Sequence, residues 1–332
     1  MRNLVASIPE VDTIIVYHPD DIRFPDPDLN ELNCSIETTS NFDNLLLTKA
    51  VLICSPSNTH FDYLKELSNN GKYVLCEKPI SVTSDQLHQI ASLPVNRKAY
   101  IYTNHNYAFT AFNRYAEILI REQRAGDPLH LEFCASHGLS YQRSAADNWR
   151  FLRPDPFDSI VGNLGIHYIH MALRLFGDIV EITSHRGRGN PNSKEPDTCT
   201  ILMRAAGGQT INIFLSYAAP YTNTARLVLT DGLLELNDGY LVESGPRTTF
   251  DNDNRFTTPP NKVLCNFDSS KAYTDESIML SLQYFLRVVG SSGSFPSSHL
   301  DLAIRSAQMV LELHCKGHDV GIIQYNNQDI LE

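Results

Sequence analysis

The stretch YVLCEKPISV, residues 73–82, decides the fold. Its apolar run YVLC is followed at once by two opposite charges, Glu77 and Lys78, and by Pro79. Continuous rather than alternating apolarity is typical of a strand in a parallel sheet that is covered on both faces. Open sheets of this kind bind their ligands at the carboxyl ends of the strands. We therefore interpret the triplet Glu77-Lys78-Pro79 as a strand end that carries chemistry.

A lysine at such a place can donate to a substrate hydroxyl or take up and release its proton. The proline after it stiffens the backbone and can adopt the cis form. The alternative is a surface ion pair in front of a helix, which any sequence can contain. Only spatial context separates the two interpretations.

The first third of the chain alternates apolar runs with helical patterns. Besides YVLC, the runs expected to form strands are 13–18, 50–55 and 99–104. Residues 59–71 have apolar side chains at helical spacing and end at Gly71, a good C′ residue, and a second helix opens with the capping-box pattern 83–86. This alternation predicts an α/β domain with a Rossmann-type, doubly wound parallel sheet over residues 1–108.

The pattern changes after residue 108. We expect a helix at 110–126, a strand at 129–135, an irregular stretch at 136–161 and a helix from about 163 to 176. Strands are then expected at 179–183, 198–204, 209–217, 226–231, 233–236 and 240–243, helices near 275–289 and 298–316, and exposed loops at 190–196 and 251–261. Successive strands with short turns predict a second, α+β domain over residues 109–332, built on a large, mostly antiparallel open sheet.

Composition narrows the class of partner. The chain of 332 residues has 27 Lys and Arg against 38 Asp and Glu, and its net charge of −11 repels nucleic acid and anionic membranes. No apolar run approaches the roughly 18 to 20 residues of a membrane span, and no secretory signal core is present. The seven scattered cysteines, without a C-x-x-C pair, fit reduced thiols and no structural zinc. We expect a cytoplasmic protein that binds a small molecule and no metal, nucleic acid or membrane.

The segment ICSPSNTH, residues 53–60, ends the strand before YVLC. Its turn offers free amides, and Asn58 or Thr59 can cap the following helix, so an anionic or ribose-bearing ligand can rest there. A capped loop without a ligand explains the same residues equally well.

The segment GNLGIHYIH, residues 162–170, places Asn163 and His167 four residues apart. A helix from this point would stack them on one face, where His167 can serve as a general base near neutral pH. His170 shares that side, but no Asp, Glu or Cys lies near enough to complete a metal site. The alternative is a histidine that only packs in the core.

Together, in this order and spacing, these segments resemble the Gfo/Idh/MocA family of NAD(P)-dependent sugar oxidoreductases over nearly the whole chain. The most specific match is VLICSPSNTHFDYLKELSNNGKYVLCEKPIS, and YTNHNYAFTAFNRYAEIL, GNLGIHYIHMALRLFG and AYTDESIMLSLQYFLRVVGSSGSF follow in register. The resemblance implies a Rossmann domain that binds NAD or NADP, a second domain whose open sheet mediates homo-oligomers, and a substrate that is a sugar, a polyol or a nucleotide sugar.

The resemblance also implies catalytic residues. The family's Lys and His, which flank the reacting carbinol, fall on Lys78 and His167, and its Asp falls on Asn163. Asn cannot hold negative charge, so it can orient His167 or a substrate hydroxyl but cannot raise the basicity of its neighbours. Members that act on nucleotide-linked sugars resemble this chain in having Asn there. The resemblance gives no role for His170.

Further residues of the site follow from the same resemblance. The cofactor is expected to contact His18, Ser55, Pro56, Asn58, His60, Glu77, Lys78 and Asn104, and the substrate Trp149, Arg150, Asn163, His167 and Tyr273. Glu77 is expected to hold the ribose next to the nicotinamide. NAD and NADP both stay open, because the family's ribose-binding acid is replaced by His18, with Asp20 and Asp21 close behind.

The family's first strand and its G-x-G-x-x-G loop would lie roughly 20 residues before Met1. Two expectations follow: either the sequence begins late, which we favour, or the chain is a diverged member that binds a sugar or a protein without catalysis. A sheet without its middle strand would expose apolar faces, which favours the first.

Overall fold

The computed structural model describes residues 11–20, 34–142, 156–237, 239–267 and 270–323, without the side chains of residues 270–275. The chain forms two units. The first consists of residues 1–81, 85–104 and 279–301, and the second of residues 82–84, 105–278 and 302–332.

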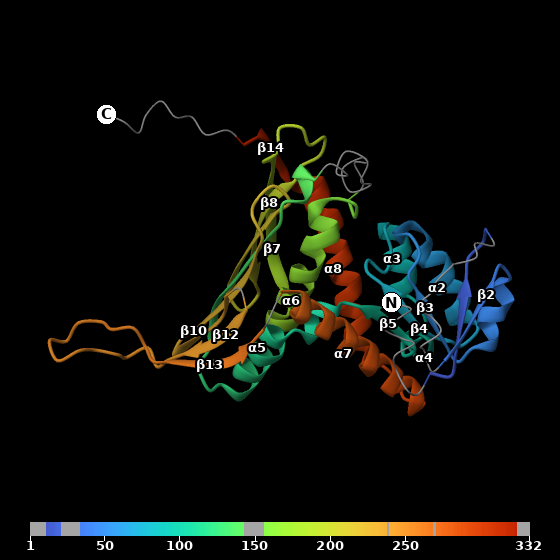
Figure 1. The fold of residues 1–332 in the computed structure, drawn as a ribbon, viewed down its shortest axis with the longest axis horizontal. Helices are drawn as coiled ribbons and strands as arrows, with labels where there is room; N and C mark the ends of the chain where they lie inside the picture. Colours follow the sequence, from blue (N-terminus) through green and yellow to red (C-terminus); the bar gives the residue numbers. More distant parts are fainter. Residues whose placement is uncertain (1–10, 21–33, 143–155, 238, 268–269, 324–332) are drawn as a thin grey trace. The chain divides into compact units, whose positions relative to one another are not determined.

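The strands of the first unit are parallel, as predicted (Figure 1). One sheet has the order β3 (Ala50–Ile53), β4 (Tyr73–Glu77), β5 (Ile101–Asn104). A second parallel pair consists of β1 (Thr13–Tyr17) and β2 (Ser35–Thr39). Among the described residues no strand joins β1 to β3. The strand β2 was not predicted, because its sequence SIETT lacks an apolar run.

Burial explains why the sequence folds in this way. Val74, Leu75 and Cys76 of β4 are fully buried, as expected for a strand covered on both faces. The helices α2 (His60–Asn69) and α3 (Ser84–Ala91) follow β3 and β4, and a short helix α4 (Val95–Lys98) precedes β5. Gly71 has a φ of 67°, a left-handed conformation that ends α2 at little cost for glycine.

Residues from the end of the chain complete the core of the first unit. They come from the second half of α7 (Ser270–Gly290), from the connection after it, and from the start of α8 (Ser297–Lys316). The fully buried ring of Tyr102 lies with its centroid 5.2–6.2 Å from those of Tyr284, Phe285, Phe295 and His299. Backbone bonding adds to this packing, since Phe295 N donates to Ala99 O over 2.8 Å.

The second unit is built on one nine-stranded sheet of order β13-β12-β11-β10-β6-β9-β8-β7-β14. Its strands are β6 (Pro128–Ser136), β7 (Ile179–Arg188), β8 (Thr198–Ala205), β9 (Thr210–Ser216), β10 (Thr222–Leu229), β11 (Gly232–Asn237), β12 (Tyr240–Ser244), β13 (Asn261–Asn266) and β14 (His318–Ile322). Only the pairs β6–β9 and β7–β14 are parallel among these described strands, so the expectation of a mostly antiparallel sheet is confirmed. The edge strands β13 and β14 were not predicted, because their apolar residues are few.

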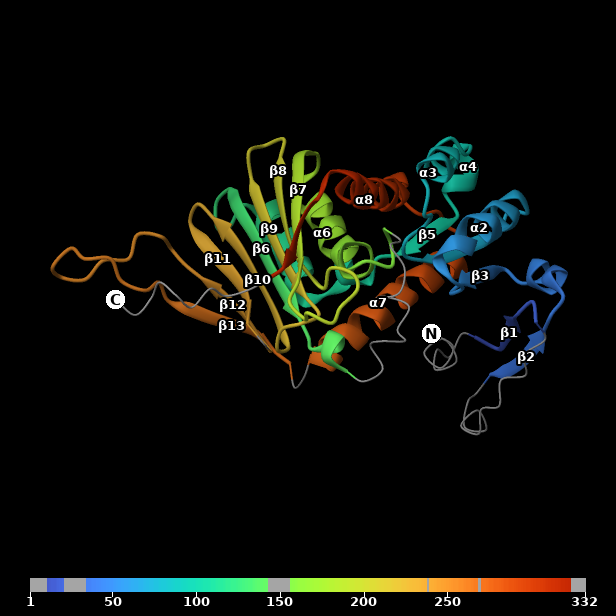
Figure 2. The same cartoon turned by 90° about the horizontal axis from the view of Figure 1, so that it is seen from above.

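One face of this sheet packs against α5 (Ala111–Glu122) and α6 (Ile166–Phe176), and Figure 2 shows α6 along it. The ring of Phe133 in β6 meets Phe112 of α5 and Tyr168 of α6 at 5.8 and 4.9 Å. Gly165 lets the start of α6 approach closely, because an added Cβ would lie 3.1 Å from Leu215. We name the opposite face the outer face; it carries Leu202, Phe214, Val242 and Val263.

Phe295→Ala should destabilise the first unit, although this residue lies far from it in the sequence. Its ring is 3% exposed and packs on Tyr73, Tyr102 and Phe285. We expect a loss of about 3–5 kcal/mol in the free energy of unfolding, measured by urea denaturation. Phe256→Ala is the control, since Phe256 is 85% exposed and should change stability by less than about 0.5 kcal/mol. Equal losses for both variants would contradict the packing role of residues 279–301.

Candidate functional site

In the first unit, the ends of β4 and β5 bring three of the expected site residues together. Glu77 pairs with Asn104 in the register of the two strands, and Asn104 Nδ2 donates to Glu77 Oε1 over 2.8 Å. Glu77 and Lys78 are half-buried, and the Lys78–Pro79 peptide is cis. The triplet is therefore tied into the sheet edge and is not an isolated surface ion pair.

The loop after β3 is held against the same turn by His60. The ring of His60 is buried, with Nδ1 2.6 Å from Pro79 O and Nε2 2.9 Å from Ser55 O. Pro56 and Asn58 lie in the same short loop, at the 3-10 turn η3 (Ser57–Thr59). His60 therefore connects two loops of the expected cofactor site, while its direct contact with a cofactor stays a prediction.

The expected cap at the start of α2 is wrong for Thr59. Thr59 is the N-cap residue, but no side-chain cap hydrogen bond forms among the described residues. Its hydroxyl donates to Pro56 O over 2.8 Å and lies 2.6 Å from Ser55 Oγ. The two hydroxyls shape the loop and do not satisfy the amides of the helix.

His18 follows β1 directly. Its Nδ1 accepts from Asp20 N over 3.1 Å, which fixes the turn after the strand. Asp21 lies outside the described residues. The choice between NAD and NADP by this turn stays a prediction.

In the second unit, Asn163 lies in a π-helical turn, η8 (Val161–Gly165), and α6 begins only at Ile166. The helix expected from about 163 to 176 is present, and its first turn is π-helical. Gly162 is closely packed in this turn, where a Cβ would lie 2.2 Å from Pro156 O. Single π-helical turns are frequent at functional sites.

Side chains of this turn and of the start of α6 meet two tyrosines that were not singled out from the sequence. Asn163 Nδ2 donates to the hydroxyl of Tyr217 over 3.0 Å, and the ring of His137 stacks on Tyr217 at 4.8 Å. The ring of His167 stacks on Tyr107 at 4.3 Å. Tyr217 follows β9, and no local signal in the sequence links it to Asn163.

His170 stacks on His105, with the ring centroids 4.0 Å apart and the planes within 3°. Both rings are buried. The described residues contain no cluster of three or more His, Cys, Asp or Glu side chains arranged for a metal ion. His170 therefore belongs to a packed aromatic group behind His167.

Two groups near the site stay neutral at ordinary pH. Burial raises the pKa of Tyr107 from its usual 10.0 to about 12, and neighbouring Tyr221 and Tyr217 add to this rise. Burial also raises the pKa of the Cys76 thiol well above its usual value, with Glu77 adding to the effect. Neither group can therefore act as a base near neutral pH.

Three expected residues are not placed. Trp149 and Arg150 lie outside the described residues, and the side chain of Tyr273 in α7 does so too. Lys78 belongs to the first unit and His167 to the second, so their convergence on one carbon stays a prediction.

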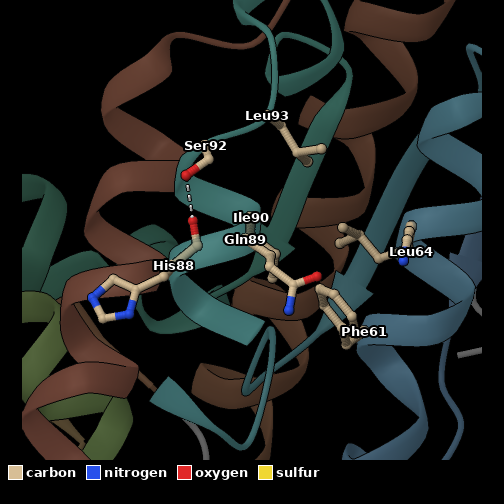
Figure 3. A pocket seen from close by; sticks show the side chains of 8 residues that line it. Phe61, Leu64, His88, Gln89, Ile90, Ser92 and Leu93 are labelled. Atoms are coloured by element: carbon tan, nitrogen blue, oxygen red, sulfur yellow. Dashed lines mark hydrogen bonds between the residues drawn. The ribbon is translucent and has the colours of Figure 1, made fainter. Parts of the chain in front are cut away.

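A mostly apolar groove among the described residues is lined by residues of α2, of α3 and of the segment just after α3 (Figure 3). It encloses about 340 Å³ and is lined by Phe61, Leu64, Lys65, His88, Gln89, Ile90, Ser92 and Leu93. It offers few polar groups and none of the expected site residues. No described helix has the length and apolarity needed to cross a bilayer.

Comparison with known proteins gives the family. Residues 2–105 match the model of an oxidoreductase family with an NAD-binding Rossmann fold, and residues 113–235 match the GFO/IDH/MocA C-terminal domain. Together the two matches cover more than half of the chain. The chain therefore belongs to the Gfo/Idh/MocA family of NAD-binding oxidoreductases.

Individual relatives agree with this assignment. Oxidoreductase YhhX of Escherichia coli is 30% identical over 164 residues, 47% of this chain and 46% of that protein. D-apiose dehydrogenase of Rhizobium rhizogenes is 25% identical over 182 residues, 52% of this chain and 50% of that protein. The matches span half or less of the length of these curated relatives.

A solved structure extends the likeness to nearly the whole chain. A myo-inositol dehydrogenase from Corynebacterium glutamicum superposes with a TM-score of 0.71 at 17% identity, covering 94% of this chain and 91% of that chain. At this identity the likeness establishes the fold.

Tyr107→Phe should change the alkaline titration while keeping the ring that stacks on His167. The unfolded chain releases the Tyr107 proton near pH 10, and the folded chain keeps it to about pH 12. Wild-type stability should therefore be full below pH 10 and fall as the pH rises toward 12, less steeply in the variant. Tyrosinate absorbance of wild type minus variant should titrate near pH 12. A difference that titrates near pH 10 would show Tyr107 to be solvated.

Proposed function

We propose that the chain is an NAD(P)-dependent dehydrogenase that transfers a hydride between the nicotinamide and a carbinol carbon of a sugar, polyol or nucleotide sugar. The observation that carries this proposal is the Glu77–Asn104 pair beside Lys78, at the strand ends of a unit with the NAD-binding family fold. Ligands of open α/β sheets bind at such strand ends. The D-apiose dehydrogenase relative supports a carbohydrate substrate.

Lys78 and His167 are the catalytic pair of this proposal. A half-buried ammonium can donate to the substrate oxygen, and an imidazole can take or return its proton near neutral pH. Either group can be the base, because both are within the repertoire of general acid–base catalysis at pH 7. When bound, the cofactor supplies the hydride acceptor or donor.

Asn163 has an orienting role in this scheme. Its Nδ2 donates to Tyr217, which orients the amide, and an amide oxygen is an acceptor of the kind that a substrate hydroxyl or His167 requires. As an amide it adds no negative charge, so it does not increase the basicity of the imidazole as the family's Asp would. This supports a substrate subclass such as nucleotide sugars.

The first unit is proposed to hold the nicotinamide end of the cofactor. Glu77 has one carboxylate oxygen on Asn104 and offers the other to a ribose diol. The loop with Ser55, Pro56 and Asn58, tied by His60 to the Lys78–Pro79 turn, would line the same side. On the substrate side, Trp149, Arg150 and Tyr273 remain candidates, the arginine for a phosphate or carboxylate.

Lys78→Ala and His167→Ala should each lower kcat by about 100-fold or more, because each removes a group that moves or stabilises a proton. The measurement is nicotinamide absorbance with a panel of free sugars, polyols and nucleotide sugars against NAD and NADP. Lys65→Ala, an exposed lysine of the same unit, is the matched control and should keep full activity. Near-normal turnover in both site variants would remove this mechanism.

The second candidate function is sugar or protein binding without catalysis, which the Asn163 position favours. The same panel of sugars, polyols and nucleotide sugars distinguishes catalysis from binding without catalysis. Binding of a sugar, seen as a thermal shift, without turnover by the wild-type chain would select the non-catalytic function.

We also propose that copies of the chain associate through the outer face of the nine-stranded sheet. This face carries apolar side chains, Leu202 and Val263 among them, at 44% and 60% exposure. Among its charged residues, Arg226 pairs with Glu235 at 2.7 Å and Arg204 pairs with Glu181, so these need no partner charge. Burial of such a face against a second copy removes apolar surface from water.

Leu202→Lys should shift the chain toward smaller species, because it places an unpaired charge in that contact. The measurement is the molar mass by light scattering after size-exclusion chromatography. Leu47→Lys is the control, since Leu47 is 81% exposed in the first unit. An unchanged mass for Leu202→Lys, or an equal change for both, would place the association elsewhere.

A further inference from the structure

A continuous line of hydrogen bonds in the first unit runs from an aromatic core residue to the carboxylate of Glu77. Tyr102 Oη lies 2.8 Å from Ser281 Oγ, Ser281 Oγ donates to Asn104 Oδ1 over 2.7 Å, and Asn104 Nδ2 donates to Glu77 Oε1 over 2.8 Å. Ser281 is fully buried, and Tyr102 and Asn104 are each 2% exposed. Only Glu77, at the end of this line, reaches solvent.

The direction of the line follows from its last member. An ionised carboxylate only accepts, so Asn104 must present its NH2 group to Glu77 and its carbonyl oxygen to Ser281. The carbonyl oxygen carries no hydrogen, so Ser281 must donate its single hydroxyl hydrogen to Asn104. Tyr102 must then donate to Ser281. Every hydrogen in the line therefore points toward Glu77, and aligned bonds of this kind polarise one another.

Ser281 is the decisive member because it fixes which way the Asn104 amide faces. Among the described residues, the Ser281 hydroxyl is the group that holds Asn104 Oδ1, so without it the amide can rotate away from Glu77. The helix α7 supplies this hydroxyl from a sequence distance of 177 residues, so neither strand can set the orientation alone.

We propose that Ser281 is a positioning residue for cofactor binding: it aims the Asn104 amide at Glu77, which holds one carboxylate oxygen in place and leaves the other for the diol of the ribose next to the nicotinamide. This assignment rests on the proposed function, because it takes Glu77 as a ribose ligand. The positioning of Glu77 by itself does not depend on it.

Ser281→Ala should weaken the binding of NADH and NADPH by about tenfold. This is the effect expected when one hydrogen bond to a charged group, here from Asn104 to Glu77, is no longer held in place. The affinity for ADP, which lacks the nicotinamide ribose, should stay unchanged. Isothermal calorimetry on the full-length protein gives the dissociation constants of NADH, NADPH and ADP. A general loss of folding would weaken all three ligands alike, so ADP separates positioning from damage.

Three further variants sharpen the test. Tyr102→Phe keeps the Ser281 hydroxyl on Asn104, so it should lower stability but change the NADH dissociation constant less than twofold. Ser281→Thr keeps the hydroxyl and should restore binding. Ser306→Ala is the matched control, because Ser306 is a fully buried helical serine whose hydroxyl donates only to Ala303 O. If Ser281→Ala does not fold, Ser281→Cys, with a weak donor of similar size, should show the same selective loss.

Crystal structures of wild type and Ser281→Ala without cofactor supply a readout independent of binding. We expect the contact between Asn104 Nδ2 and Glu77 Oε1 to be kept in the first and broken in the second. An intact contact in the variant, or an unchanged NADH affinity, overturns the inference even if Lys78→Ala abolishes turnover. A broken contact in a chain whose Lys78→Ala and His167→Ala variants stay active would instead overturn the proposed function alone.

Discussion

The burial of Tyr102 is the constraint on which the first unit depends. Its ring is held by aromatic side chains from residues 279–301, and its hydroxyl, 2% exposed with the rest of the residue, must find a partner in the core. That partner is Ser281, and from there the bonds lead to Glu77. Tyr102 thus connects the packing of the core with the orientation of Glu77, at the strand end where a ligand is proposed to bind.

In the second unit, the candidate site residues Asn163 and His167 are held by contacts at the start of α6. Gly162 and Gly165 are closely packed in the π-helical turn just before α6. The turn presents Asn163 to Tyr217, and the next turn sets His167 on the ring of Tyr107. Close packing of small residues and the contacts of Asn163 and His167 thus occur in the same short segment.

Local patterns in the sequence were enough for the parts of the fold that are buried and continuous. The run at 73–76 predicts β4 because burial on both faces requires uninterrupted apolar residues. The strands β2, β13 and β14 carry no apolar run of that length, and they lie at the edges of their sheets. The partnerships of Tyr217 with Asn163 and of Ser281 with Asn104 join distant segments, which no spacing rule encodes, while the roles of Lys78 and His167 remain proposals.

The dependence of the first unit on residues 279–301 has a consequence for synthesis. About 200 residues separate Asn104 from Asp301, so at about 5–20 residues per second a ribosome needs roughly 10–40 s to deliver the segment that closes this core. The core around the N-terminal sheet therefore stays incomplete while the second unit is being synthesised. A chain truncated after Asn104 would permanently lack residues 279–301, which complete the core of the first unit.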